Sequence, residues 1–201
     1  MSWIKTISYA QASGKLKKLY ERVSGPDNNV DNIMIAHSLR PHTLEGHMAL
    51  YKNVLHHNAN QLATYQLEAL GVYVSMLNRC SYCVEHHYRG YKRLLKDDGR
   101  AVLVRQALQS NNIESVFSKG EATLFHYANK LTLQPDSVNE GDLQAMRSAG
   151  YDDGIIVEVN QVVAYFNYAN RTVLGLGVTP EGDVMGLSPN DSDDPDSWGH
   201  T

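Results

Sequence analysis

The chain has 201 residues, of which 42% are hydrophobic and 20% are charged, and its formal net charge is −4. A chain of this length buries the core of one domain or at most two. No apolar run approaches the roughly 20 residues that span a bilayer, and no basic stripe argues for nucleic acid. We therefore expect a soluble globular protein that binds neither membranes nor nucleic acid. The N-terminus lacks the basic start and apolar stretch of a secretory signal, so we expect a cytoplasmic location.

Helical spacing of apolar residues dominates the chain, whereas alternating strand patterns are scarce. The first helix is predicted over about residues 9–24, because Gly25 and Pro26 end its apolar stripe. Further helices are predicted over about residues 32–38, 41–57, 61–77, 80–96, 100–109, 118–131, 139–149 and 152–174. The expected fold class is therefore all-α.

The predicted helix over residues 61–77 is apolar on nearly all sides, which is typical of a helix packed among others. Its one acidic residue is Glu68. A buried carboxylate without a partner is costly, so Glu68 should be hydrogen-bonded or ion-paired. His87 is one candidate partner, and a salt bridge to Arg79 or Arg89 is the alternative.

The last residues of the chain differ in composition from the rest. Residues 181–201 carry six acidic residues and no Lys or Arg. We expect a domain over residues 1–180 followed by a flexible, solvated C-terminal tail (residues 181–201). Binding of a partner by this acidic tail is the alternative.

The only two cysteines, Cys80 and Cys83, stand at the start of a predicted helix and shortly before His87. At about 100° per residue, the three side chains project at roughly 0°, 300° and 340°, and so share one face. The first turn of a helix favours a thiolate over a thiol, and the thiolate is the reactive form. A histidine can give or take a proton near neutrality. Residues 61–96 are thus a candidate redox core.

Other chemistry remains possible for this cluster. Zinc could bind Cys80, Cys83, His86 and His87, but a structural site usually draws on a second ligand pair, and the chain has none. His86 also projects about 100° away from His87. A c-type haem needs His directly after the second cysteine, where this chain has Val84. Packing of two free thiols in a core is the simplest alternative. We expect no metal and no cofactor.

The remaining polar and aromatic side chains carry weaker signals. Tyr82, Tyr88 and Tyr91 are expected to pack in the core, and the alternative is that they line an entry for an organic substrate. Six histidines show no ligand spacing, and we expect them to be solvated or satisfied in the core. They are His37, His42, His47, His56, His57 and His126.

The spacing of Glu68, eleven residues, Cys80-x-x-Cys83, three residues and His87 resembles the core of the AhpD-like alkylhydroperoxidases, in the carboxymuconolactone decarboxylase-like superfamily. The resemblance is close over residues 68–87 and extends, in organisation only, to peroxidase-related members of about this length. It implies a helical bundle that oligomerises. It also implies a dithiol that reduces organic hydroperoxides and is regenerated by a thiol reductant. The decarboxylase branch typically lacks the cysteine pair, so the redox branch is favoured.

Carried onto this chain, the resemblance implies that Cys83 becomes the sulfenic acid and that Cys80 is the resolving cysteine and proton donor. Glu68 and His87 would form the proton relay. Tyr82 departs from the pattern, because some members have a histidine there and a phenol with a pKa of about 10 is a poor base at neutrality. The expected partners are a small organic hydroperoxide, a thiol or dithiol reductant, and further copies of the chain. The alternative function is a non-catalytic oligomeric scaffold or redox sensor whose dithiol controls assembly.

Overall fold

Nine α-helices form the frame of residues 2–201, the part of the chain that this computed structural model describes. They are α1 (Gly14–Val23), α2 (Asn32–Ile35), α3 (Pro41–Leu55), α4 (Thr64–Leu77), α5 (Ser81–Leu95), α6 (Asp98–Gln109), α7 (Lys119–Leu133), α8 (Glu140–Ser148) and α9 (Asp153–Leu176). Short 3-10 turns lie at Tyr9–Gln11, Pro26–Asn28, Ile113–Ser115 and Pro135–Ser137. No strand occurs within residues 2–201, so the all-α prediction is confirmed. None of the helices in this range has the length and hydropathy needed to cross a membrane.

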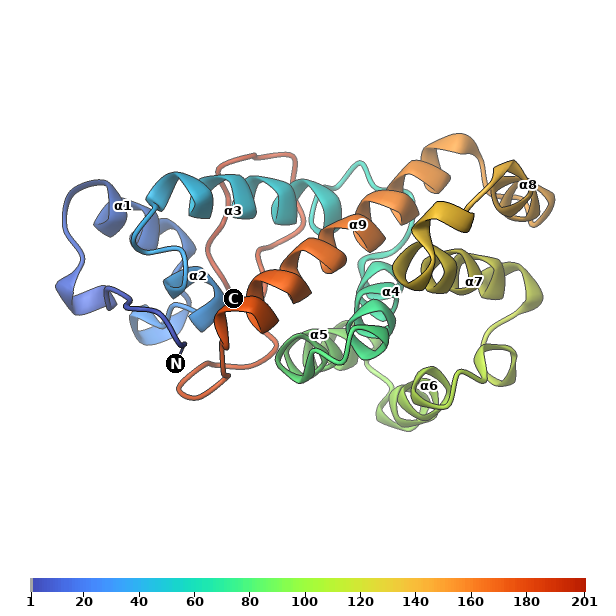
Figure 1. Cartoon of the computed structure of the whole chain (residues 1–201), viewed down its shortest axis with the longest axis horizontal. Helices are drawn as coiled ribbons and strands as arrows, with labels where there is room; N and C mark the ends of the chain where they lie inside the picture. The colour runs from blue at the N-terminus through green and yellow to red at the C-terminus, as the bar shows by residue number, and fades with distance from the viewer. Residues whose placement is uncertain (1) are drawn as a thin grey trace.

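Helix α4 is the centre of the molecule and packs against α5, α7 and α9 (Figure 1). Its apolar sequence, with Leu67 and Leu70 almost fully buried, suits this position. Gly71 allows α9 to approach closely, because a Cβ at this position would lie 2.0 Å from the ring of Phe166. Figure 1 shows α1 and α2 at one end of the molecule, α6 to α8 at the other, and α9 crossing between them. The predicted burial of the helix over residues 61–77 is therefore confirmed.

The first helix is shorter than its apolar stripe indicates. A separate 3-10 turn covers Tyr9–Gln11, and α1 begins only at Gly14, whose φ is 56°. This left-handed conformation suits glycine and interrupts a continuous helix. The prediction of one helix from residue 9 is therefore wrong at its start, whereas its apolar face is buried as expected.

The turn between α4 and α5 sets the position of the dithiol. Asn78 does not cap α5, because its side-chain nitrogen donates to Asn167 and Asn170 on α9. Arg79 adopts a left-handed backbone conformation, with φ of 58°, where the chain turns from α4 into α5. Cys80 then becomes the N-cap of α5, and its N–H donates to the carbonyl of Ser75 at 2.9 Å.

The acidic C-terminal tail packs against the helices, which differs from the solvated tail that we expect from its composition. Trp198 and His200 are buried, and the guanidinium of Arg22 lies 3.7 Å from the Trp198 ring centroid. The ammonium of Lys52 on α3 donates to the carbonyl of Asn190 and to Oγ of Ser192. One aromatic anchor and a buried cation thus hold an otherwise polar segment in place.

Candidate active site

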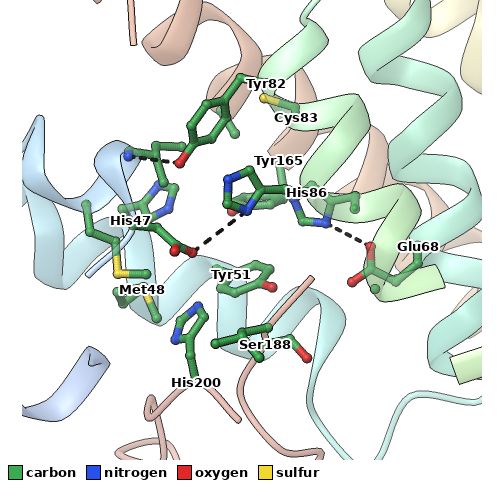
Figure 2. A pocket seen from close by; sticks show the side chains of 17 residues that line it. His47, Met48, Tyr51, Glu68, Tyr82, Cys83, His86, Tyr165, Ser188 and His200 are labelled. Atoms are coloured by element: carbon green, nitrogen blue, oxygen red, sulfur yellow. Dashed lines mark hydrogen bonds and ion pairs between the residues drawn. The ribbon is translucent and has the colours of Figure 1, made fainter. Parts of the chain in front are cut away.

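A cavity of about 40 Å³ lies where α2, α3, α4, α5 and α9 meet the C-terminal tail. Three of the residues predicted to act together, Glu68, Cys83 and His87, line it. Figure 2 shows Cys83 beside Tyr82 on one side of the cavity and Glu68 on another. The structure therefore brings the predicted carboxylate, thiol and imidazole to one cavity.

The two thiols contact each other, but only one of them faces this cavity. Cys80 and Cys83 are free and buried, with their Sγ atoms 2.8 Å apart. Cys83 lines the cavity, whereas Cys80 borders a separate surface groove next to Trp3 and Val173. The geometry thus distinguishes a thiol that a molecule in the cavity can meet from a thiol placed behind it.

A shared hydrogen bond moves the pKa values of the two thiols in opposite directions. Contact with the Cys83 thiol, aided by the Cys83 backbone N–H, lowers the pKa of Cys80 against the effect of burial. The same contact raises the pKa of Cys83 well above its ordinary value, and burial and the charge on Cys80 act in the same direction. From the sequence we expect both thiols to gain thiolate character. The negative charge of the pair instead rests first on Cys80, because the hydrogen bond between the two thiols lowers its pKa and raises that of Cys83.

Asn170 on α9 supports the dithiol from within the core. It is fully buried, donates to Oγ of Ser75 at 3.0 Å and accepts from the side chain of Asn78 at 2.9 Å. Its side chain also hydrogen-bonds to Cys83, which lowers the pKa of that thiol and partly offsets the effect of Cys80. Sequence reasoning missed Asn170. An asparagine inside the apolar stripe of the predicted helix 152–174 was the signal available.

Glu68 is almost completely buried, and its partner is His87. Nδ1 of His87 lies 2.8 Å from Oε2 of Glu68. A second imidazole nitrogen, Nε2 of His56, lies 4.0 Å from Oε1. The ion pairs of the described residues include none between Glu68 and Arg79 or Arg89, so the salt-bridge alternative is wrong.

His56 links this pair to the tail. Its Nδ1 lies 3.0 Å from Oδ1 of Asp191, and its Nε2 lies 3.2 Å from the Tyr51 hydroxyl. The hydrogen bond with His56 lowers the pKa of Asp191. A histidine that we expect to have only a solvated or core role therefore connects the buried carboxylate to the C-terminal tail.

Asp183, from the tail, organises a second polar cluster on α5. Its Oδ2 accepts from the Tyr82 hydroxyl at 2.7 Å and lies 3.1 Å from Nε2 of His86. The backbone N–H of Asn32 donates to Oδ1 at 3.1 Å. On the other side of the same imidazole, Oδ2 of Asp31 lies 4.0 Å from Nδ1 of His86. Tyr82, the residue at which the sequence departs from the expected pattern, is thus a hydrogen-bond donor to a buried carboxylate.

Burial raises the pKa of Asp31 to about 6; His86 opposes this shift and Asp183 adds to it. Neither carboxylate is predictable from spacing, because both lie far from the dithiol in the chain. Folding alone brings them to α5.

Two further histidines, His47 and His200, line the cavity. Burial lowers the pKa of His47 to about 3 and that of His200 to about 4, so both rings are neutral near pH 7. Nδ1 of His47 is buried and has no hydrogen-bond partner among the described residues. His47 follows Leu44 by three residues, so its place on the apolar face of α3 was visible in the sequence.

The zinc alternative finds no support in this arrangement. His86 turns to Asp183 and His87 turns to Glu68, away from a common centre with the thiols. Across residues 2–201, no group of three or more His, Cys, Asp or Glu side chains has a geometry that could hold a metal ion.

Comparison with known proteins gives matches at the level of structure. No protein-family model matches the chain, and no curated protein sequence does. An uncharacterized peroxidase-related protein from Ralstonia eutropha JMP134, described as an alkylhydroperoxidase AhpD core, superposes with a TM-score of 0.78 at 21% identity. The match covers 92% of this chain and 96% of that protein. The chain has the AhpD-like fold.

Two other solved structures are similar to this chain. An uncharacterized peroxidase-related protein from Silicibacter sp. TM1040 is 24% identical, with a TM-score of 0.69 over 78% of this chain and 81% of its own. The debrominase Bmp8, solved with 2,3,4-tribromopyrrole, is 13% identical, with a TM-score of 0.71 over 90% of this chain and 94% of its own. The AhpD-like helical fold predicted from Glu68, Cys80, Cys83 and His87 is confirmed. Identities this low establish the fold alone.

Proposed function

We propose that this chain reduces small organic hydroperoxides with electrons from a thiol or dithiol reductant, by cycling Cys80 and Cys83 between dithiol and disulfide. One arrangement carries the proposal. Cys83 lines the same cavity as the hydrogen-bonded pair of Glu68 and His87, and the Cys80 thiol contacts the Cys83 thiol. The proposal includes a reducing cytoplasm, which keeps the pair reduced between turnovers.

In the first step, Sγ of Cys83 attacks the distal oxygen of the hydroperoxide, and the O–O bond breaks. The proton of the Cys83 thiol passes along the 2.8 Å contact to the Cys80 thiolate. The departing alkoxide takes that proton, or one from His87, and leaves as the alcohol. Cys83 is oxidised to the sulfenic acid and the hydroperoxide is reduced.

In the second step, the Cys80 thiolate attacks the sulfur of the Cys83 sulfenic acid and closes a disulfide. The hydroxide that leaves takes a proton from Nε2 of His87, which gains it from solvent while Glu68 holds Nδ1, and departs as water. Two equivalents of an external thiol then reduce the disulfide and become oxidised to a disulfide themselves. The net reaction converts one hydroperoxide and two thiols into an alcohol, water and a disulfide.

The test is consumption of tert-butyl hydroperoxide in the presence of excess dithiothreitol, comparing the wild type with Cys83→Ser. We expect the wild type to consume the hydroperoxide and Cys83→Ser to fall to the rate of dithiothreitol alone. Cys80→Ser is the matched control, and it tests which cysteine becomes the sulfenic acid. It should still form a sulfenic acid that dimedone traps at Cys83, whereas Cys83→Ser should give no dimedone adduct at Cys80.

The same measurement distinguishes the proposed peroxidase from the alternative, a redox-sensing scaffold. Equal consumption by the wild type and Cys83→Ser would exclude a peroxidase for this substrate class. A dithiol that closes under oxidant and changes the oligomeric state, with no turnover, is the behaviour expected of a redox-sensing scaffold. Size-exclusion chromatography of the reduced and oxidised protein records that change.

A further inference from the structure

The cavity in front of Cys83 has an acidic wall. Asp31 and Glu68 line it, and Asp183 lies directly behind, in contact with Tyr82 and His86. None of its lining residues in the described chain is Lys or Arg. The polar groups that a ligand in this cavity meets are therefore carboxylates, one thiol, imidazoles, phenols and one hydroxyl.

Two cations that contact the tail, Lys52 and Arg93, are bound to backbone and hydroxyl oxygens. The ammonium of Lys52 donates to the His56 carbonyl at 2.8 Å and to Oγ of Ser192 at 2.9 Å. The guanidinium of Arg93 donates to Oγ of Ser188 at 2.7 Å. These bonds hold the tail in place and leave neither cation lining the cavity.

The imidazoles beside the carboxylates do not reverse the sign of this charge. His86 lies between Asp183 and Asp31, at 3.1 Å and 4.0 Å, and His87 is bonded to Glu68. Even with both rings protonated, three carboxylates would face two imidazolium groups. In a buried site such charges are weakly screened, so an added anion is repelled.

The opposite wall provides hydrogen bonds without charge. His47 and His200 are buried, and burial lowers the pKa of each ring to about 3 and about 4, respectively. Nδ1 of His47 is buried without a partner among the described residues, although it belongs to a residue that lines the cavity. A polar but uncharged ligand group would satisfy it. Figure 2 shows His200 and Met48 across the cavity from Cys83.

The volume of the cavity favours a small ligand. About 40 Å³ is room for a few water-sized groups. Leu187, Ser188 and His200 of the tail form part of its lining. A small hydroperoxide fits this volume better than one that carries a long chain.

We propose that this cavity selects small, uncharged hydroperoxides and rejects those that carry a carboxylate, with Asp31 as a specificity-determining residue. The inference rests on the proposed function for the identity of the ligand as a hydroperoxide. The charge selection itself is a property of the approach to Cys83, and it is measurable without turnover.

The first experiment alkylates the reduced protein with iodoacetamide, which is neutral, and with iodoacetate, which has nearly the same size and is an anion. Peptide mass spectrometry gives the rate constant at Cys83 for each reagent, and N-acetylcysteine provides the reference ratio of the two rates. We expect the ratio of iodoacetamide to iodoacetate at Cys83 to exceed the reference by about tenfold or more. A ratio equal to or below the reference would overturn the proposal, whatever any variant does.

Variants then assign the effect to Asp31. Asp31→Asn should lower the ratio at Cys83 severalfold, by speeding the reaction with iodoacetate more than that with iodoacetamide. Asp193→Asn removes an exposed carboxylate of the tail and should leave the ratio unchanged. Asp31→Ser gives a second measurement if the asparagine variant does not fold. An unchanged ratio in folded Asp31 variants overturns the assignment to this residue.

The second experiment compares tert-butyl hydroperoxide with 2-hydroperoxy-2-methylpropanoate, in which a carboxylate replaces one methyl group. We expect kcat/KM to be about tenfold or more higher for the neutral compound. Equal values would overturn the selectivity and leave the peroxidase function standing. A retained alkylation ratio with no reduction of either compound would instead overturn the proposed function and leave the charge selection standing.

Discussion

Nδ1 of His87 lies 2.8 Å from Oε2 of Glu68, a carboxylate that is only 1% exposed. A carboxylate this deeply buried requires a partner, and this imidazole provides one. The contact also fixes the ring orientation and directs the N–H of a neutral ring to Nδ1, so that Nε2 carries the lone pair. The two side chains are therefore expected to move protons as one unit.

Glu68→Gln and His87→Ala should each slow the reaction of Cys83 with hydroperoxide by about 10²-fold, because each removes part of the same relay. The double variant should be hardly slower than either single variant. Stopped-flow measurement of sulfenic acid formation gives the rate constants of the wild type, the two single variants and the double variant. Glu85→Gln, which removes a carboxylate from α5 that pairs with Arg105, is the control and should react at the wild-type rate. Losses that multiply in the double variant would show that the two residues act independently.

The helices and the pairing of Glu68 with His87 were predictable because their signals are local. Apolar residues repeat at helical spacing along every long element, and Gly71 interrupts neither the pattern nor the helix. Glu68, Cys83 and His87 lie on two consecutive helices, so spacing and the cost of burying a carboxylate were enough to pair two of them. The start of α1 was missed because Gly14 adopts a left-handed conformation that no apolar pattern reveals.

The rest of the site depends on contacts between distant segments. Asp183 reaches Tyr82 and His86 only because the tail folds back over α5. Composition predicted a solvated tail, since six acidic residues outweigh the few apolar ones. Trp198 is buried against Arg22 of α1, and a single tryptophan in an acidic segment was the one local signal of docking.

Asn170→Ala should raise the pKa of the Cys83 thiol, because the side chain that hydrogen-bonds to this sulfur is lost. The pH profile of iodoacetamide alkylation at Cys83 measures the shift. The variant should also lose about 1–3 kcal/mol of unfolding free energy, since Ser75 and Asn78 lose a buried partner. Asn167→Ala is the matched control one turn earlier on α9, and it should lower stability without moving the thiol profile. A profile identical to that of the wild type would show that Asn170 is only structural.

Acid should destabilise the fold partly through His47. Burial lowers the pKa of this ring from 6.5 to about 3 in the folded protein. Its contribution to stability is therefore complete above pH 6.5 and is lost as the pH falls towards 3. The shift corresponds to a few kcal/mol, on the order of 1.4 kcal/mol for each pH unit.

His47→Gln should accordingly lose less unfolding free energy than the wild type when the pH falls from 7 to 4. Urea unfolding at a series of pH values measures this difference between the two proteins. Burial raises the pKa of Asp31 from 3.8 to about 6, so this group makes the fold more stable as the pH falls through that range. Asp31 is present in both proteins, so its effect cancels in the comparison. His126→Gln changes an exposed ring and should follow the wild-type curve. Parallel curves for His47→Gln and the wild type would contradict the assignment.

Lys52→Met should release the C-terminal tail, because the substitution keeps the buried aliphatic stem and removes the ammonium that donates to Asn190, Ser192 and the His56 carbonyl. Three oxygen acceptors lose their donor, at a cost of about 1–3 kcal/mol to docking. Proteolysis within residues 181–201 should then accelerate by about tenfold for each 1.4 kcal/mol lost. The fluorescence of Trp198 should shift to the red as its ring enters water, whereas Trp3 is already 80% exposed. Lys15→Met breaks an exposed pair with Glu45 and should change neither readout. A tail as resistant to protease as in the wild type would mean that Trp198 and Asp183 hold it without Lys52.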